Sequence, residues 1–447
     1  MASFQTKLGR LAGLSGRAPA VVDETAPEEP TPTPPPTSGV QPVSQPAPGG
    51  KPSLDELRDR IARILGREGA PAQRPDPTRA ELPFVVERTE LGPLYVSRVR
   101  SAGAARVGKA PLIAARDADP AMLALLALDP VLAGCDPRRA LYLDTETTGL
   151  AGGTGTVPFL VGMSWFDAEL GGFVTEQALL RRLGEEAPIL ELVARRIAGA
   201  SMIVTFNGKA FDLPLLRTRF VMNRMKAPAE PPHLDLVHVA RRIHKTRMKS
   251  RTLVAIENEV LGRGRVGDVA GGDIVATYAH FLRTGDDEAL LGVVEHNVAD
   301  VLAMVALVGL YGEPWAAPAT DEAPVTSLLD AADLAGVART LKQAGALEQA
   351  VVMADAAVAR GGGAEARKTR GDIHKARGDK ARALGDYEVL AQEVDDPAVR
   401  LELCKLYEHH VRAFDRALTL IDLGTGESPE AAAKRRGRLE KKLSRKK

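Results

Sequence analysis

The sequence predicts an α/β domain followed by an all-α region of helical repeats. Between about residues 80 and 317, short apolar runs typical of strands alternate with longer segments of helical spacing, which favours one mixed sheet flanked by helices. After residue 325 the strand pattern stops, and a helical motif recurs at intervals of 33 and 34 residues. The length of 447 residues is enough for two to three domains.

Three segments precede the α/β domain. Residues 1–19 are weakly amphipathic, and residues 20–52 are so rich in Pro, Thr, Gly and Glu that they predict a disordered linker. A docking site for a proline-reading module is the less favoured interpretation of that linker. Residues 53–79 are expected to form a helix and a connector, because Ser53-Leu54-Asp55-Glu56 matches a capping box.

The α/β domain is expected to begin with two strands, joined by a turn at Gly92-Pro93. A helix around Met122–Leu132 should then lead into a strand that starts at Leu141. The expected strands are Phe84–Arg88, Leu94–Val99, the acidic strand from Leu141, Phe159–Phe166, Gly172–Gln177 and Met202–Thr205. The later helices are expected over Glu186–Arg196 and from Leu213, Leu236 and Asp286 onward.

Composition excludes several classes of protein. Hydrophobic residues make up 45% and charged residues 26%, as in ordinary globular proteins. The two isolated cysteines provide neither a disulfide framework nor zinc-ligand spacing. No apolar run reaches membrane-spanning length, so we expect a cytoplasmic protein without a membrane partner. Because the net charge is only +1, any attraction to nucleic acid must come from local basic patches.

The acidic strand carries two carboxylates, Asp144 and Glu146, at its end. Side chains alternate along a strand, so these two point the same way while Thr145 points to the other face. Like charges on one face repel, and a divalent cation or a shared proton would relieve that repulsion. A solvated acidic face of an edge strand explains the pair alone about equally well. Hard oxygen ligands would favour Mg²⁺ or Mn²⁺.

Two further acidic elements are candidates for the same site. Asp212 follows the turn Asn207-Gly208 and stands at or near a helix N-terminus, where the helix dipole favours an ionised carboxylate. His296 and Asp300 stand four residues apart in a late helix and therefore share a face. Taken singly, each matches a common structural arrangement: an N-cap aspartate and a surface His–Asp pair.

The three elements in this order resemble the DEDD-type exonucleases, which have the ribonuclease H-like fold of DnaQ-like proofreading domains. The motifs are Asp144-x-Glu146, Asn207-x-x-x-Phe211-Asp212 and His296-x-x-x-Asp300. A longer match, over about residues 80 to 312, is to the YprB-type branch of that superfamily. It is carried by Leu91-Gly92-Pro93-Leu94, His233-Leu234-Asp235-Leu236, Ser250-Arg251-Thr252-Leu253, Thr284-Gly285-Asp286 and His296-Asn297. The histidine spacing differs from proofreading members, which place Tyr four or His five residues before the aspartate.

The resemblance implies a metal-dependent 3′→5′ exonuclease that hydrolyses phosphodiester bonds in RNA or DNA. Asp144, Glu146, Asp212 and Asp300 would be the ligands of two Mg²⁺ or Mn²⁺ ions. His296 would orient or deprotonate the attacking water. The second interpretation is a catalytically weak or inactive protein that binds nucleic acid and recruits partners through its helical repeats.

Candidate substrate contacts lie beside these motifs. Thr147 follows the acidic pair, and Asn207 belongs to the second motif. The segment 241–251 carries six positive charges and no acid, and from it we expect Arg247, Lys249 and Arg251 to follow a phosphate backbone. A solvated helix end would give the same pattern.

The C-terminal region, 325–425, resembles tetratricopeptide repeats. Gly345–Ala350 and Gly378–Ala383 are similar copies, and Ala413–Ala417 is a degenerate third. Generic helical hairpins remain an alternative. The repeats are candidates for binding a protein partner, and residues 426–447 form a basic tail that is either solubilising or an additional contact to nucleic acid.

Overall fold

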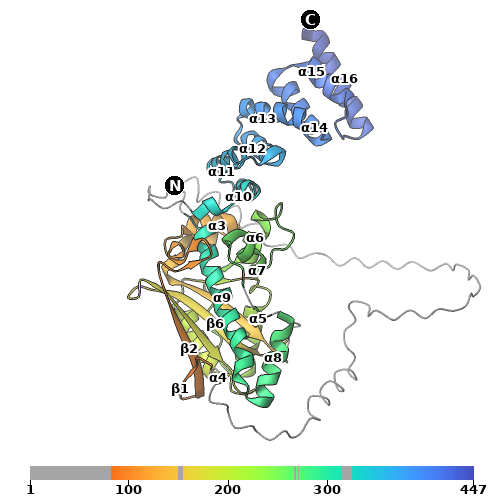
Figure 1. Ribbon diagram of the computed structural model, residues 1–447. Helices are drawn as coiled ribbons and strands as arrows, with labels where there is room; N and C mark the ends of the chain where they lie inside the picture. The colour runs from red at the N-terminus through yellow and green to blue at the C-terminus, as the bar shows by residue number, and fades with distance from the viewer. Residues whose placement is uncertain (1–81, 150–154, 266–267, 270, 314–324, 447) are drawn as a thin grey trace, which may run out of the picture. The chain divides into compact units, whose positions relative to one another are not determined.

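The computed structural model describes residues 82–149, 155–265, 268–269, 271–313 and 325–446. Seven strands form one mixed sheet in the order β1-β2-β7-β6-β5-β8-β9 (Figure 1). They are β1 (Val85–Thr89), β2 (Gly92–Ala102), β5 (Ala140–Thr147), β6 (Pro158–Asp167), β7 (Gly172–Leu179), β8 (Met202–Thr205) and β9 (His233–Asp235). The short strands β3 (Arg106–Val107) and β4 (Ala110–Pro111) pair separately. A mixed sheet flanked by helices, with a helical C-terminal region, confirms the predicted fold class.

Strand β5 is where the direction of pairing changes. It is antiparallel to β6 but parallel to β8, and β8 is parallel to β9. The strands on the other side, β1, β2, β7 and β6, pair antiparallel throughout. The carboxyl ends of β5, β8 and β9 therefore meet at one edge of the sheet, the position where α/β sheets commonly place their sites.

Side chains of β5 alternate between two buried clusters. Ala140 and Tyr142 belong to a cluster with residues of α3, α6 and the second half of α9. Leu141 and Leu143 belong to the other cluster, with residues of α4 and α5. The alternation continues to the acidic pair, so the expectation that Asp144 and Glu146 share a face is consistent with the packing of the same strand.

Helices cover the sheet, and α9 crosses it against β5, β6 and β7 (Figure 1). Among the described residues α9 is the one helix long and apolar enough to cross a membrane by composition, and 61% of its most apolar window is buried within the protein. The helices are α3 (Pro120–Ala127), α4 (Ala187–Gly199), α5 (Asp212–Met222), α6 (Leu236–Ile243), α7 (Leu253–Ile256), α8 (Gly271–Thr284) and α9 (Asp287–Tyr311). A π-helical turn, η4 (Glu257–Leu261), follows α7.

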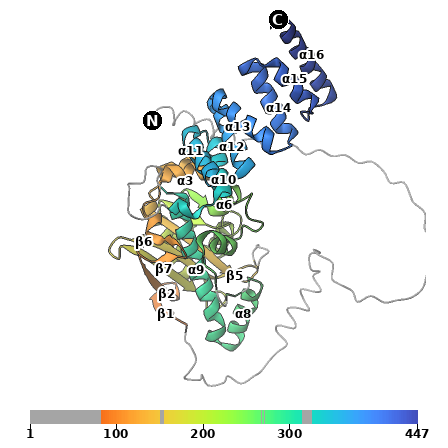
Figure 2. The same cartoon turned by 45° about the horizontal axis from the view of Figure 1, so that its top comes forward.

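The C-terminal region consists of helices that each contact the next (Figures 1 and 2). The three similar sequence copies fall at the turns of three successive helix pairs. Gly345, Gly378 and Arg412 have the left-handed backbone conformation there, which favours glycine at the first two. The helices are α10 (Ala331–Gln343), α11 (Leu347–Ala359), α12 (Gly363–Arg377), α13 (Lys380–Glu393), α14 (Pro397–Leu406), α15 (Phe414–Asp422) and α16 (Pro429–Lys446). Their assignment to tetratricopeptide repeats stays a prediction.

The first C-terminal helix, α10, packs into the α/β domain. His244, at the end of α6, is fully buried and has its Nδ1 2.7 Å from Oδ1 of Asp333 on α10. A Cβ atom on Gly336 would lie 2.1 Å from the carbonyl oxygen of Ile243, so only glycine allows this backbone contact. The hydrophobic cluster of α3, α6 and α9 continues through α10 and α11. The packing therefore crosses the domain boundary that the sequence predicts between residues 317 and 325.

Several local expectations differ from the structure. The helix expected over Met122–Leu132 ends at Ala127, since Leu128 has a left-handed backbone. Neither β9 nor α8 was expected. The basic tail is helical in α16, and three of its cations surround the buried carboxylate of Glu408. The expectations for 1–19, 20–52 and 53–79 lie outside the described residues.

Candidate active site

The acidic pair lies where β5 approaches α9 and α5. Glu146 is buried, with 9% of its surface exposed, and Asp144 is half-buried. The pairing of β5 with β6 shifts between Glu146 and Thr147. Thr147 is buried, and its hydroxyl donates to the carbonyl of Gly149 at 2.9 Å. The hydroxyl thus holds the end of the strand.

Asp212 is the first residue of α5, one position after the N-cap. The turn before it starts at Asn207, whose backbone is left-handed. The backbone N–H groups of Asn207 and Lys209 donate to the carboxylate of Asp235 at the end of β9, at 2.7 and 3.0 Å. The neighbouring parallel strand therefore braces the turn that carries Asp212. The side chain of Asn207 is exposed.

Thr145 connects Asp212 to the acidic strand. Its hydroxyl donates to Oδ1 of Asp212, although its side chain leaves β5 on the face opposite to Asp144 and Glu146. The contact is buried and links residues 67 positions apart. Asp212 thereby reaches the strand from the α5 side.

Helix α9 contributes Asn297 between the two predicted residues His296 and Asp300. The Asn297 Nδ2 donates to Oδ2 of Asp144 at 2.8 Å, and its Oδ1 accepts from Nε2 of Gln177 at 2.9 Å. Gln177, Gly162 and Asp144 are register partners across β7, β6 and β5. A Cβ atom on Gly162 would lie 2.0 Å from Oδ1 of Asn297, so the missing side chain makes room for the amide.

His296 is oriented by a carboxylate from the preceding loop. Its Nδ1 lies 2.6 Å from Oδ1 of Asp268, and its Nε2 lies 3.5 Å from Oδ2 of Asp300. An Nδ1–H that donates to Asp268 leaves Nε2 facing Asp300. Asp300 also pairs with Arg265, a buried guanidinium that binds Glu257 on its other side.

Burial and mutual repulsion raise the pKa values of three carboxyls, those of Asp144, Glu146 and Asp212. Burial raises the pKa of Asp144 well above its usual value, and the charges of Asp300, Glu146 and Asp212 add to the effect. Burial likewise raises the pKa of Glu146 to about 7, against the opposing charge of His296. The pKa of Asp212 rises to about 6, mainly through burial, although the hydrogen bond from Thr145 lowers it.

The pKa of His296 is also raised. Burial lowers it, but the charge of Asp300 and the hydrogen bond to Asp268 outweigh burial. Acids that hold their protons beside a histidine that favours its cation indicate an excess of negative charge in the cluster.

The donor chemistry of this cluster fits a divalent cation. Carboxylate oxygens are the preferred ligands of Mg²⁺ and Mn²⁺, and a cation would let the buried carboxyls ionise. Within the described part of the chain, no three His, Cys, Asp or Glu side chains are arranged closely enough to hold a metal ion. Asp300, the fourth predicted ligand, is instead paired with Arg265.

The predicted basic contacts have different surroundings. Arg247 pairs with Asp330 and Asp333 of the α10 segment, at 3.0 and 2.9 Å. Arg251 donates to the carbonyl of Met248, and Lys249 is exposed. The structure thus gathers the acidic candidates with His296, whereas Arg247 is engaged by carboxylates of the helical region.

Sequence reasoning missed the residues that hold the candidates in place. Asn297 belongs to the His296-Asn297 motif, but its contact with Asp144 depends on the strand order. Arg265 and Asp268 lie in a segment without periodicity, so only their charges could have pointed to them.

Comparison with known proteins places this site in a family context. Residues 141–311 match the model of the RNase_H superfamily. That span includes Asp144 and Glu146 on β5, and His296 and Asp300 on α9. The chain is also similar to the protein named Uncharacterized protein YprB of Bacillus subtilis (strain 168), with 36% identity over 176 residues. The similarity covers 39% of this chain and 42% of that relative.

Proposed function

We propose that the protein is a cytoplasmic, metal-dependent 3′→5′ exonuclease of RNA or DNA. The observation that carries the proposal is the hydrogen bond by which Asn297 of α9, the helix of His296 and Asp300, binds Asp144 on the acidic strand. Residues from three separated segments share one buried electrostatic environment, which a structural role does not require. The ribonuclease H-like domain is consistent with the same chemistry.

Asp144, Glu146, Asp212 and Asp300 would hold two Mg²⁺ or Mn²⁺ ions. When bound, the ions supply charge that activates water and stabilises the phosphate during in-line displacement. Asn297 fixes one oxygen of Asp144, and Thr145 fixes one oxygen of Asp212, so each carboxylate presents its other oxygen. These hydrogen bonds favour the ionised carboxylates that a cation needs.

His296 is the proposed base. Asp268 accepts a hydrogen bond from Nδ1–H and orients the ring, which leaves Nε2 to accept a proton from water. The raised pKa of His296 makes it a stronger base, but a larger fraction is protonated at neutral pH until added positive charge lowers that pKa.

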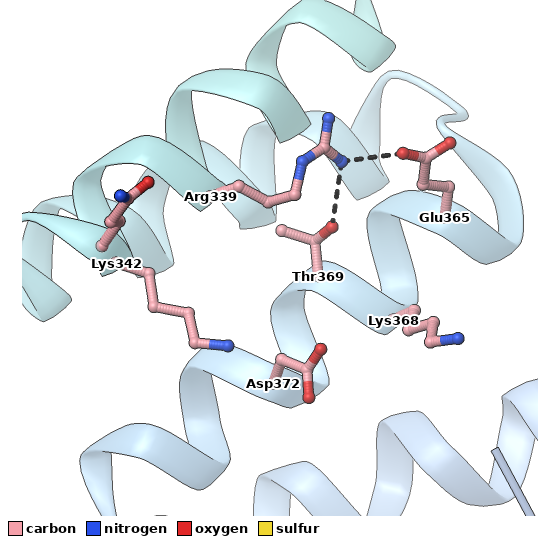
Figure 3. Close-up of a pocket in the computed structure, with 7 residues that line it drawn as sticks. Arg339, Lys342, Glu365, Lys368, Thr369 and Asp372 are labelled. Carbon is pink, nitrogen blue, oxygen red and sulfur yellow. Dashed lines mark hydrogen bonds and ion pairs between the residues drawn. The ribbon is translucent and has the colours of Figure 1, made fainter. Parts of the chain in front are cut away.

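The helical pairs are proposed to bind a protein partner. A pocket of about 460 Å³ lies between α10 and α12 and is lined by charged side chains, with Arg339 held by Glu365 and Thr369 (Figure 3). The lining residues are Arg339, Lys342, Gln343, Glu365, Lys368, Thr369 and Asp372. Polar side chains on two adjacent helices offer hydrogen bonds to an extended segment.

End-labelled single- and double-stranded RNA and DNA test the proposal. The wild type should shorten at least one substrate from its 3′ end with Mn²⁺ or Mg²⁺ and not with chelator. Asp144→Asn and Asp212→Asn should abolish cleavage while circular dichroism stays unchanged. Binding without cleavage under every condition would instead favour the nucleic-acid-binding scaffold, with the helical pairs as its recruiting surface.

A further inference from the structure

Arg265 places a permanent positive charge inside the acidic centre. Only 6% of its side chain is exposed, and its guanidinium pairs with Asp300 and, at 3.4 Å, with Asp268. Since a guanidinium keeps its proton at any working pH, this charge cannot be titrated away. The pairing therefore persists unless another cation replaces it.

A third carboxylate, Glu257, binds Arg265 on its other side. Glu257 in η4 is fully buried, and its Oε2 accepts from Nε of Arg265 at 2.7 Å. Arg263 reaches the other oxygen of Glu257 at 3.1 Å and is 38% exposed. A buried carboxylate is costly without a partner. Glu257 thus anchors Arg265 beside the centre, whether or not Asp300 is available.

Asp300 is shared between two roles. It is the fourth carboxylate of the proposed metal centre, and its Oδ1 is bound by Nη2 of Arg265. The ion pair therefore joins Arg265 to the carboxylate that α9 contributes to the proposed centre.

We infer that Arg265 is a resident counter-cation that competes with a divalent ion for Asp300. Asp300 can then bind an ion only as Arg265 withdraws toward Glu257. The inference rests on the proposed function and adds to it a competitor for the metal that belongs to this chain. Displacement of Arg265 from Asp300 should be the step that limits activity at low metal concentration.

Mn²⁺ binding to the full-length protein tests this competition, by calorimetry and by electron paramagnetic resonance of free Mn²⁺. Arg265→Gln should tighten Mn²⁺ binding about tenfold relative to the wild type, because a positive charge a few Å away is removed. Arg265→Lys keeps the charge and should bind Mn²⁺ as weakly as the wild type. Arg263→Gln, which touches Glu257 but not Asp300, should match the wild type.

Asp300→Asn gives a second measurement that does not depend on Arg265 variants folding. It removes the carboxylate for which Arg265 and Mn²⁺ compete, so it should bind Mn²⁺ more weakly than the wild type. Mn²⁺ bound by the wild type with an affinity that Arg265→Gln does not change would overturn the inference and leave the proposed function standing. No Mn²⁺ bound by the wild type, Arg265→Gln and Asp300→Asn alike would overturn both.

Discussion

Asn297 Nδ2 donates to Oδ2 of Asp144 at 2.8 Å, and this contact ties α9 to the central strand β5. The amide cannot turn over without loss, because its Oδ1 accepts from Gln177 at 2.9 Å. Gln177 in turn donates to the carbonyl of Val294. The chain of hydrogen bonds therefore sets both the position of α9 over the sheet and the orientation of the first carboxylate.

Asn297→Ala should reduce both stability and activity. It removes the donor to Oδ2 of Asp144 and one of the two acceptors of Gln177 Nε2, which costs about 1–3 kcal/mol in unfolding free energy. Without this hydrogen bond the Asp144 carboxylate is no longer held in one orientation, so cleavage should slow roughly tenfold to a hundredfold. Urea unfolding and cleavage rates measure the two effects. Glu295→Ala, an exposed neighbour on α9, is the control and should change neither; equal effects from both variants would contradict the role given to Asn297.

The acidic strand β5 shows which structural features could be predicted from the sequence. Alternation placed Asp144 and Glu146 on one face because it follows from strand geometry alone, and the packing of Tyr142 and Leu143 on opposite sides agrees. The mixed sheet followed from the order of periodic segments. Strand β9 was missed because its three residues are too few for a pattern.

The contacts of Asn297 and Arg265 could not be predicted from the sequence, for a different reason. Asn297 reaches Asp144 only because Gly162 lies between Gln177 and Asp144 in the sheet register, which depends on strand order. Arg265 reaches Asp300 from 35 residues away in a segment without repeat or periodicity. Such contacts are set by tertiary packing rather than by local spacing.

Stability in chelator should fall as pH rises from about 5 to 7. Glu146 has a folded-state pKa of about 7 against a usual 4.5, so the folded protein retains a proton that the unfolded chain releases. Each such carboxyl then costs about 1.4 kcal/mol for every pH unit in this window. The raised pKa of His296 acts in the same direction, because its stabilising charge is lost as pH rises.

Urea unfolding at pH 5, 6, 7 and 8 checks this dependence. Glu146→Gln cannot ionise, so its stability should fall less steeply than that of the wild type. Added Mn²⁺ should flatten the wild-type curve as well, since a bound cation offsets the buried charges. Identical slopes for wild type and Glu146→Gln would show that Glu146 does not titrate in this range.

Lys249 and Arg247 should respond differently to mutation. Lys249 is exposed, so Lys249→Ala should leave stability unchanged and reduce the salt dependence of nucleic-acid binding by about one phosphate contact. Arg247→Ala removes a partner of fully buried Asp333 and should destabilise the protein by ~3 kcal/mol. Thermal unfolding and binding isotherms at several salt concentrations separate the two. A Lys249→Ala slope equal to that of the wild type would remove this residue from the interface.

Two glycine-to-alanine variants should have opposite effects on stability. A Cβ on Gly336 would meet the backbone of Ile243 at 2.1 Å, so Gly336→Ala should push α10 away from α6 and cost about 1–3 kcal/mol. Gly385 lies exposed inside α13, and its Cβ would meet nothing within 4 Å. Gly385→Ala should therefore stabilise the protein by about 0.5–1 kcal/mol.

The Gly336 variant tests whether the helical region is part of the core of the α/β domain. Removing everything after residue 318 would also remove α10, the partner of buried His244 and of the cluster around α3 and α6. Such a truncation should unfold or aggregate, so it cannot isolate the contribution of the repeats. A cut after residue 395 keeps α10 to α13 and should preserve cleavage. Full stability in Gly336→Ala, measured by urea unfolding, would show instead that α10 is only loosely attached.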